Sequence, residues 1–264
     1  MTTGDDDLAV AVASTVAEVG TWLAAQQVHV TPWRTWPEFR NQFDRVDSPA
    51  RGRLRAALER LRPGAAWVDE FEVDLPSGEL WCVDPIDGAV QYLQGLPQWS
   101  VSVTLVREGR PAVAVLHAPP LGETYAAVRG KGATRNGAPI RPSGKSELGI
   151  AVVGTSHPPF VTGQPGVAEA SGRSLAAVLA KVGAVRNLGP TSWQIGDVGA
   201  GRLDAFWQFG RDAANLIGAS LVAGEAGAVV TDATGREWDA GAESFVAAAP
   251  VLHAQLVEIL SGTV

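Results

Sequence analysis

Two aspartates three residues apart, Asp84 and Asp87, are the side chains of this sequence best placed to do chemistry. They lie in Asp84-Pro85-Ile86-Asp87-Gly88, directly after the apolar run Leu80–Val83. Pro85 fixes its own φ, and Gly88 permits a positive φ or the close approach of a ligand. Carboxylates this close repel each other unless a proton or a cation lies between them, and Mg²⁺ prefers oxygen ligands. The same five residues are also ordinary turn chemistry, so taken alone they leave a metal site and a plain turn open.

Two further acidic positions stand near the ends of expected elements. Glu70 follows Asp69 at the end of a short apolar strand, and Asp212 follows Phe209-Gly210-Arg211 at the start of a helical pattern. Taken singly, Asp212 is typical of a helix N-cap and Glu70 of a solvated residue at a strand end.

The elements expected in the first half are helices followed by a sheet. Apolar residues at near-helical spacing predict a helix over residues 7–26. Residues 27–48 are expected to be irregular, and a second helix over 49–61 would take Ser48 as N-cap and Pro49 as its first residue. Strands are expected over 66–73, 79–83, 99–108, 111–117 and 124–129, with a hairpin turn at Asn136-Gly137. Asp84 would leave the second strand, and the strands would form an antiparallel meander.

The second half alternates strands with helices. Strands are expected over 150–154, 185–188, 204–207 and 228–231, and helices over 171–181, 192–200, 212–225 and 252–260. This order indicates a layered α/β half. No linker or repeat separates the halves, so residues 1–264 are expected to form a single compact unit with approximate halves 1–148 and 149–264.

Composition narrows the classes of protein. Hydrophobic residues make up 46% of the chain and charged residues 19%, as in ordinary globular proteins. No run of 18 apolar residues predicts a membrane span, and the acidic N-terminus has no signal-peptide pattern, so we expect a cytoplasmic protein. Cys82, the only cysteine, fits a buried thiol. The net charge of −7 argues against nucleic acid as a partner, although a small phosphate can bind where metals invert the local field.

Several motifs together resemble the inositol monophosphatase family. Trp81–Gly88 is similar to the central motif of that family, and Gly130–Ala133 with Asn136-Gly137 resembles the segment after its meander. Ala200–Ala205 and the segment from Asp212 to Gly227 resemble its closing motifs. The resemblance runs from about Leu8 to Leu260. It implies an α+β fold of the layered αβαβα type, a homodimer, and a metal-dependent phosphatase acting on a small phosphorylated metabolite. The homodimer is also expected because the meander would offer an apolar surface.

The resemblance also implies roles for particular residues. Two or three Mg²⁺ ions, which Mn²⁺ can replace, would be held by the carboxylates and one backbone carbonyl of Glu70, Asp84, Ile86, Asp87 and Asp212. Glu70 would activate water, and Asp87 would share the catalytic role. The backbone amides of Gly88 and Ala89 would bind the phosphate. The alcohol part of the substrate would meet Thr191, Ser192 and Gln208. Arg211 is a further candidate for substrate binding, as a contact to a phosphate or carboxylate, with a structural arginine as the alternative.

The sequence departs from the family at several of these places. Ala89 stands where the family has a threonine whose hydroxyl helps to position the attacking water. Phe71 is the neighbour of Glu70 in place of a second glutamate, which leaves Glu72 as an alternative ligand. Gln208 replaces a glutamate and Arg211 a tryptophan. Since a neutral amide replaces an acceptor of sugar hydroxyls, the substrate is expected to differ from plain inositol phosphate.

The aromatic residues Trp33 and Trp36 leave two interpretations open. They could form a wall over a base or another ring, or they could belong to core or lid packing. The function expected is a Mg²⁺-dependent phosphomonoesterase on a sugar, nucleotide or specialised metabolite phosphate. The alternatives are a family member that binds a phosphate ligand or a partner without hydrolysis, and a repurposed lyase or cyclase.

Overall fold

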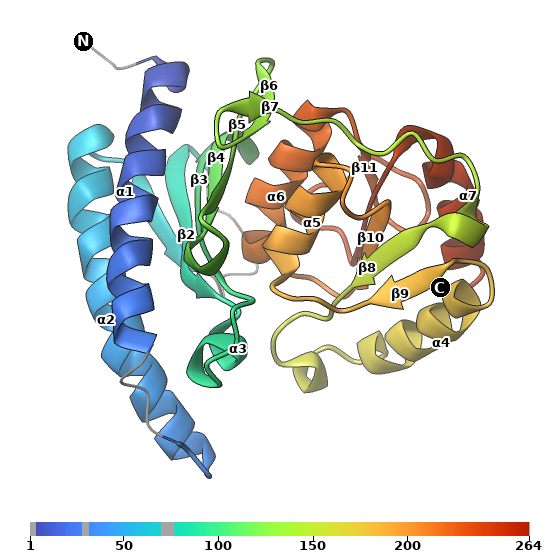
Figure 1. Cartoon of the computed structure of the whole chain (residues 1–264), viewed down its shortest axis with the longest axis horizontal. Helices are drawn as coiled ribbons and strands as arrows, with labels where there is room; N and C mark the ends of the chain where they lie inside the picture. The colour runs from blue at the N-terminus through green and yellow to red at the C-terminus, as the bar shows by residue number, and fades with distance from the viewer. Residues whose placement is uncertain (1–3, 28–31, 70–76, 264) are drawn as a thin grey trace.

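The computed structural model describes residues 4–27, 32–69 and 77–263. Five layers follow one another across the molecule in Figure 1. The first layer consists of α1 (Asp5–Gln27) and α2 (Trp36–Leu61). Both helices lie on one face of the first β-sheet, where α1 contacts β3, β4 and β5 and α2 contacts β2.

The second layer is a sheet that follows the chain order from β1 to β7 among the described residues. β1 pairs parallel with β2, and every later neighbour pairs antiparallel, so the expected meander is confirmed from β2 onward. Asn136 and Gly137 both have positive φ in the turn between β6 and β7, as their sequence predicts. The strands are β1 (Ala66–Asp69), β2 (Glu79–Asp87), β3 (Ser100–Arg107), β4 (Arg110–Ala118), β5 (Glu123–Val128), β6 (Gly132–Arg135) and β7 (Ala138–Pro139).

The remaining layers belong to the second half of the chain. Helices α5 (Thr191–Gly199) and α6 (Ala213–Ala226) form the middle layer between the two sheets. The second sheet has the strand order β11-β12-β10-β8-β9, and α4 (Val167–Leu179) and α7 (Pro250–Ser261) cover its other face. Its strands are β8 (Val152–Thr155), β9 (Ala184–Arg186), β10 (Ala205–Phe209), β11 (Val229–Thr231) and β12 (Ser244–Ala248). Short helices are α3 (Ala89–Leu93), η1 (Pro119–Leu121), η2 (Leu148–Ile150) and η3 (Val161–Gly163).

The αβαβα layering confirms the expected fold class. Three large hydrophobic clusters fill the spaces between successive layers. Helix α6 lies between both sheets, and its buried residues include Leu216, Ile217 and Leu221 on different sides. A helix that is apolar around its whole circumference is stable only when it is covered on all sides, which explains the composition of α6.

The expectation of irregular structure over residues 27–48 is wrong for the described part of this segment from Trp36 onward. Helix α2 starts at Trp36 and continues without a break through Pro49. Thr35 is its N-cap: its hydroxyl accepts from the amide of Glu38 at 3.4 Å, while Glu38 accepts from the amide of Arg34 at 2.6 Å. This capping box, followed by Pro37 in the first turn, is a stronger start signal than Ser48-Pro49.

Two strands differ from the expectation. β2 does not end before Asp84 but runs to Asp87, with a register shift against β3 between these two residues. β12 was not expected, since its sequence is short and rich in alanine, which has low strand propensity. Pairing with both β10 and β11 places it in the sheet.

Among the described helices, α1 is long and apolar enough to cross a membrane. Its residues Leu8, Val12, Val16 and Leu23 are fully buried in the cluster between α1, α2 and the first sheet. The apolar composition of α1 is therefore accounted for by packing in this fold.

Candidate active site

A cavity of about 410 Å³ lies where the end of β2 meets the starts of α3, α5 and α6. Its described lining includes three aspartates and no lysine or arginine. The lining residues are Phe43, Asp84, Ile86, Asp87, Gly88, Ala89, Val90, Gln91, Ser156, His157, Pro159, Asn187, Gly189, Pro190, Thr191, Asp212 and Asn215. The cavity therefore brings together acidic residues that are more than 120 positions apart in the chain.

The irregular end of β2 turns Asp84 and Asp87 toward the same cavity. An Asp84 carboxylate oxygen accepts the amide hydrogen of Ile86 at 2.9 Å, which holds this carboxylate against the turn. Asp87 Oδ2 accepts from the amide of Ser192 at 3.1 Å and from the Ser192 hydroxyl. Burial raises the pKa of Asp87 to about 6, although the hydrogen bonds from Ser192 favour its charged form.

Asp212 occupies the N-cap position of α6, but its side chain makes no capping hydrogen bond. One of its oxygens accepts from Gln208 Nε2 at 2.8 Å and the other from Asn215 Nδ2 at 2.7 Å. Burial raises the pKa of Asp212 to about 7, and the nearby charge of Asp87 acts in the same direction. The plain N-cap interpretation of Asp212 therefore does not describe its side chain.

Asn215 is a site residue that the sequence did not reveal. It lies one helical turn after Asp212 and lines the same cavity. Its Oδ1 is buried and has no hydrogen-bond partner among the described residues, because the amide nitrogen is turned toward Asp212. The opposite orientation would set two oxygens against each other, so the network fixes the carbonyl oxygen as an unused acceptor. The spacing of three after Asp212 was the available signal.

Gly88 has the backbone conformation that its place in the motif requires. Its φ is 92°, and a Cβ atom there would lie 2.8 Å from the carbonyl oxygen of Gln98. A side chain is excluded on both grounds, which keeps the backbone of Gly88 and Ala89 open on the cavity side. The assignment of these two residues to phosphate binding stays a prediction.

Of the three residues expected to contact the substrate alcohol, one lines the cavity and two lie behind its carboxylates. Thr191 lines the cavity and donates its hydroxyl hydrogen to Ser156 at 2.8 Å. Ser192 and Gln208 do not line it: they lie behind Asp87 and Asp212 and hold those carboxylates.

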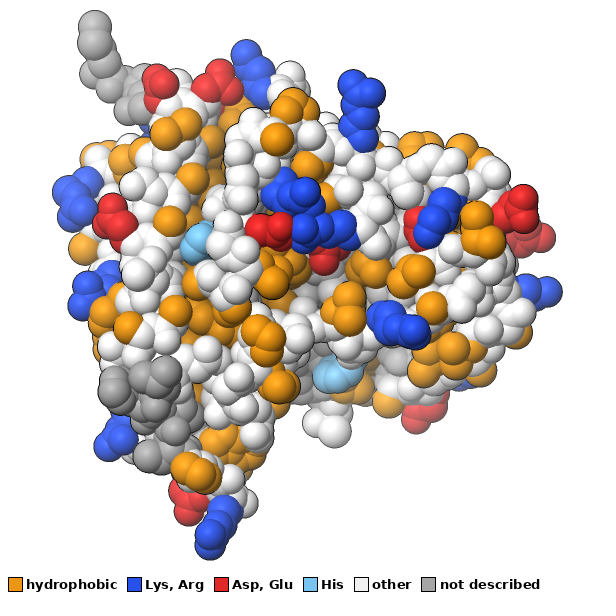
Figure 2. All heavy atoms as spheres, viewed as in Figure 1, with side chains coloured by type: hydrophobic (Ala, Val, Ile, Leu, Met, Phe, Trp, Pro, Cys, Tyr) orange, Lys and Arg blue, Asp and Glu red, His pale blue; other side chains and the backbone are white. Residues whose placement is uncertain are grey.

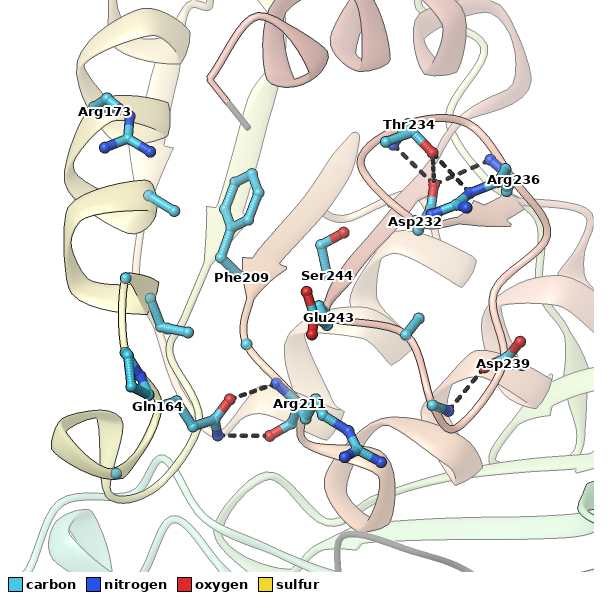
Figure 3. A pocket seen from close by; sticks show the side chains of 18 of the residues that line it. Gln164, Arg173, Phe209, Arg211, Asp232, Thr234, Arg236, Asp239, Glu243 and Ser244 are labelled. Atoms are coloured by element: carbon cyan, nitrogen blue, oxygen red, sulfur yellow. Dashed lines mark hydrogen bonds and ion pairs between the residues drawn. The ribbon is translucent and has the colours of Figure 1, made fainter.

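Arg211 lines a different hollow, between α4, the end of β10 and the segment before β12 (Figure 3). Gln164 holds its backbone there, accepting from the Arg211 amide at 2.7 Å and donating to its carbonyl at 2.9 Å. Arg211 is therefore not among the described residues that line the cavity of Asp212.

Glu70 and its alternative Glu72 lie outside the described residues. Within the described ranges, no three Asp, Glu, His or Cys side chains converge closely enough to hold a metal ion by themselves. The chemistry of the donor set nevertheless suits a divalent cation. Asp84, Asp87 and Asp212 are 9, 7 and 8% exposed, and no described lysine or arginine in the lining balances them. The residues present therefore fit a hard cation, and the orphaned oxygen of Asn215 is a further suitable donor.

The layered fold and this acidic cavity define a protein of the phosphatase type. The profile of the inositol monophosphatase family matches residues 39–263, and the chain belongs to that family. The chain is 33% identical over 217 residues to an inositol-1-monophosphatase of Mesorhizobium japonicum, covering 81% of this chain and 80% of that protein. It is also 34% identical over 195 residues to the Nus factor SuhB of Pseudomonas aeruginosa, covering 72% of each.

Solved structures agree with this assignment. An inositol monophosphatase of Thermotoga maritima superposes with a TM-score of 0.81 at 25% identity, covering 96% of each chain. SuhB of Mycobacterium tuberculosis gives a TM-score of 0.81 at 26% identity over 98% of this chain and 97% of the other. The expected family and fold are confirmed, and the expected enzyme class, a phosphatase, is confirmed at the level of the family.

Proposed function

We propose that this protein is a Mg²⁺-dependent phosphomonoesterase acting on a small phosphorylated alcohol. The observation that carries the proposal is the convergence of Asp84, Asp87 and Asp212 on one cavity without a described basic residue in its lining. Three buried carboxylates repel each other, so the arrangement favours a bound divalent cation. Family membership supports the same chemistry.

The three aspartates, the carbonyl of Ile86 and Glu70 would hold two or three ions, with Mn²⁺ able to replace Mg²⁺. When bound, such ions polarise a phosphoryl oxygen and generate a nucleophile from water at neutral pH. The contribution of Ser192 is to fix the direction of the Asp87 carboxylate through its amide and its hydroxyl. Gln208 and Asn215 do the same for Asp212. Carboxylates that are held in a fixed direction before the substrate binds lower the entropic cost of positioning the reacting groups.

The test is phosphate release from a panel of sugar phosphates and nucleotides, measured with and without Mg²⁺. Calorimetry of the protein with Mg²⁺ or Mn²⁺ gives a readout that does not depend on the substrate. We expect binding by the wild type and a clear loss in Asp87→Asn, because the substitution removes one negative charge from the cavity. Equal binding by both proteins would remove the metal site proposed here.

Binding of a phosphate ligand without hydrolysis is the second candidate function. It is favoured by Ala89, which lines the cavity where the family motif has a threonine hydroxyl. The two candidates are separated by calorimetry with a phosphorylated ligand: binding with no phosphate release on any panel member supports the second.

We propose that the protein is located in the cytoplasm and acts as a homodimer. We also propose that it does not bind nucleic acid. The acidic net charge of −7 supports the last point. On the face shown in Figure 2, Lys and Arg side chains are interspersed with acidic and apolar ones instead of forming one continuous stripe. Since one relative is named a Nus factor, a gel-shift assay with RNA tests the proposal that this protein does not bind nucleic acid.

A further inference from the structure

A row of aromatic side chains continues from the wall of the active-site cavity to its outer edge. Phe43 lines the cavity. On the same face of α2, Phe39 lies parallel to Phe43, with ring centroids 6.4 Å apart and planes at 4°, and Trp36 lies on Phe39 at 5.1 Å and 13°. Positions 36, 39 and 43 share one helix face, which explains the row. We call these three residues together with Phe160 the aromatic rim.

Phe160 approaches the row from the opposite wall. It follows His157 and Pro159, which line the cavity in the segment after β8. Its ring is set edge-on to Trp36, with centroids 6.4 Å apart and planes at 83°. Its φ is 55° and its ψ 46°, the left-handed region that is costly for a bulky side chain. Such strain concentrates at ligand clamps and other functional sites.

The outer members of the aromatic rim are exposed to a degree that core packing does not explain. Trp36 is 56% exposed and Phe160 58%. The Arg40 guanidinium lies over the Trp36 ring, 5.8 Å from its centroid, so a positive charge stands beside the exposed ring. Exposed aromatic side chains beside a cation suit a planar, anionic ligand, since rings stack on one another and the charge attracts phosphate.

Several polar side chains at the cavity are already engaged within the protein, while Gln91, Asn187 and the Asn215 carbonyl oxygen also belong to its wall. Ser156 and Thr191 hydrogen-bond to each other, while Ser192 and Gln208 lie behind the carboxylates. A cyclitol or sugar needs several unpaired donors and acceptors aimed at its hydroxyls, because a buried polar group without a partner is costly. A ring that binds by stacking makes no such demand.

We propose that the substrate is a phosphate monoester whose alcohol carries a planar aromatic ring, and that this ring binds against the aromatic rim. The inference rests on the proposed function for its phosphate end, which the acidic cavity would hold. Phe43 would contact the ring inside the cavity, and Trp36 with Phe160 would cover it at the edge. A nucleobase and another heteroaromatic ring share this chemistry.

The experiment compares kcat/KM in Mg²⁺ for adenosine monophosphate and ribose 5-phosphate, which differ by the ring alone. Pyridoxine phosphate serves as a ring-bearing ester without a nucleoside, so its rank against adenosine monophosphate separates the two ring sources. We expect the wild type to prefer a ring-bearing ester. In Trp36→Leu and Phe160→Leu, the ratio of kcat/KM with the ring to that without it should fall roughly tenfold, within the range of ring stacking. Leu179→Ala is the control, because Leu179 is 55% exposed on α4 and lines neither cavity.

The failure of the ring site can be told apart from the failure of hydrolysis. If no ester releases phosphate, calorimetry with the same ligands still reports the ring: tighter binding of adenosine monophosphate, weakened in Trp36→Leu, supports the aromatic rim. Equal kcat/KM for the two esters in the wild type, or an equal loss on both in the variants, overturns the inference and leaves the phosphatase intact. A change of oligomeric mass in Trp36→Leu would assign the aromatic rim to a subunit interface and also overturn it.

Discussion

The cavity contains buried carboxylates, which repel one another, and beside them a neutral amide side chain. Asp87 and Asp212 have raised pKa values because burial removes the water that would solvate their charges. Asn215 sits beside them as a neutral residue whose amide nitrogen is engaged and whose oxygen is not. If the proposed cation binds here, its affinity should depend on the balance between charged and neutral side chains in this cavity.

Asn215→Asp should strengthen the binding of divalent metal. The substitution adds a carboxylate to the cavity at a position whose oxygen already lacks a partner, and metal affinity rises with ligand charge. We expect Mg²⁺ to bind about tenfold more tightly, measured by calorimetry. Without metal the variant should unfold at a lower temperature than the wild type, because it loses the hydrogen bond to Asp212 and gains a like charge. Asn215→Ser is the neutral control, and unchanged affinity in Asn215→Asp would show that this oxygen does not face the ion.

Ala89→Thr tests the departure from the family motif. In the family a threonine hydroxyl at this position helps to place the attacking water, and proton-relay groups contribute about 10²–10⁴ in rate. We expect kcat to rise about tenfold or more on any ester that the wild type hydrolyses. The double variant with Asp87→Asn should stay inactive. No gain in the single variant would indicate a site adapted to a different water geometry or a different reaction.

Asp84 and Asp87 could be paired from the sequence because their motif is local: they lie three residues apart at the irregular end of β2 and line the same cavity. Their role as metal ligands stays a prediction, and Asp212 was added to them by the family resemblance alone. The roles of Ser192 and Gln208 could not be derived in the same way. Each is fixed by a contact to a carboxylate, and the Ser192 contact joins residues 105 positions apart.

At the scale of the element, the strands were easier to predict than the first part of α2. The strand pattern alternates clearly in the first half. Residues 36–48 do carry apolar residues at helical spacing, at positions 36, 39, 43 and 46, but Ser48-Pro49 offers a second N-terminal signal that favours a later helix start. The cap formed by Thr35 and Glu38 decides where the helix begins. This start positions Trp36, Phe39 and Phe43, the three members of the aromatic rim that α2 carries.

Thr35→Ala and Ser48→Ala distinguish the two possible starts of this helix. Loss of the Thr35 cap should lower the free energy of unfolding by about 1 kcal/mol. Ser48 lies inside α2, where alanine is the better helix former, so Ser48→Ala should be neutral or stabilise by a few tenths of a kcal/mol. Urea unfolding with an unchanged m-value measures both. The reverse order of effects would place the start of the helix at Ser48.

In the whole molecule, the packing of the layers leaves only some surfaces exposed and able to form a homodimer interface. The homodimer was expected partly because the meander would offer an apolar surface, and that reason is wrong: helices cover both faces of the first sheet. Among the exposed apolar residues of the described structure, Val90, Leu96 and Leu188 lie on and beside α3. Gly189 lies against the side chain of Gln91, so the segment of Leu188 adjoins α3. This surface is the better candidate for an interface, since neighbouring exposed apolar side chains mark association sites.

Light scattering at micromolar concentration should therefore give twice the mass of the chain for the wild type, and a mass near one chain for Leu96→Glu. Leu96 is 47% exposed and does not line the acidic cavity, so a charge there opposes association without touching the carboxylates. A charge introduced into an apolar interface loses its water on association, which costs several kcal/mol in the dimer alone. Leu179→Glu, at a comparably exposed position on α4, should keep the mass of the wild type. A monomeric wild type would exclude the dimer, and an unaltered dimer in Leu96→Glu would place the interface away from α3.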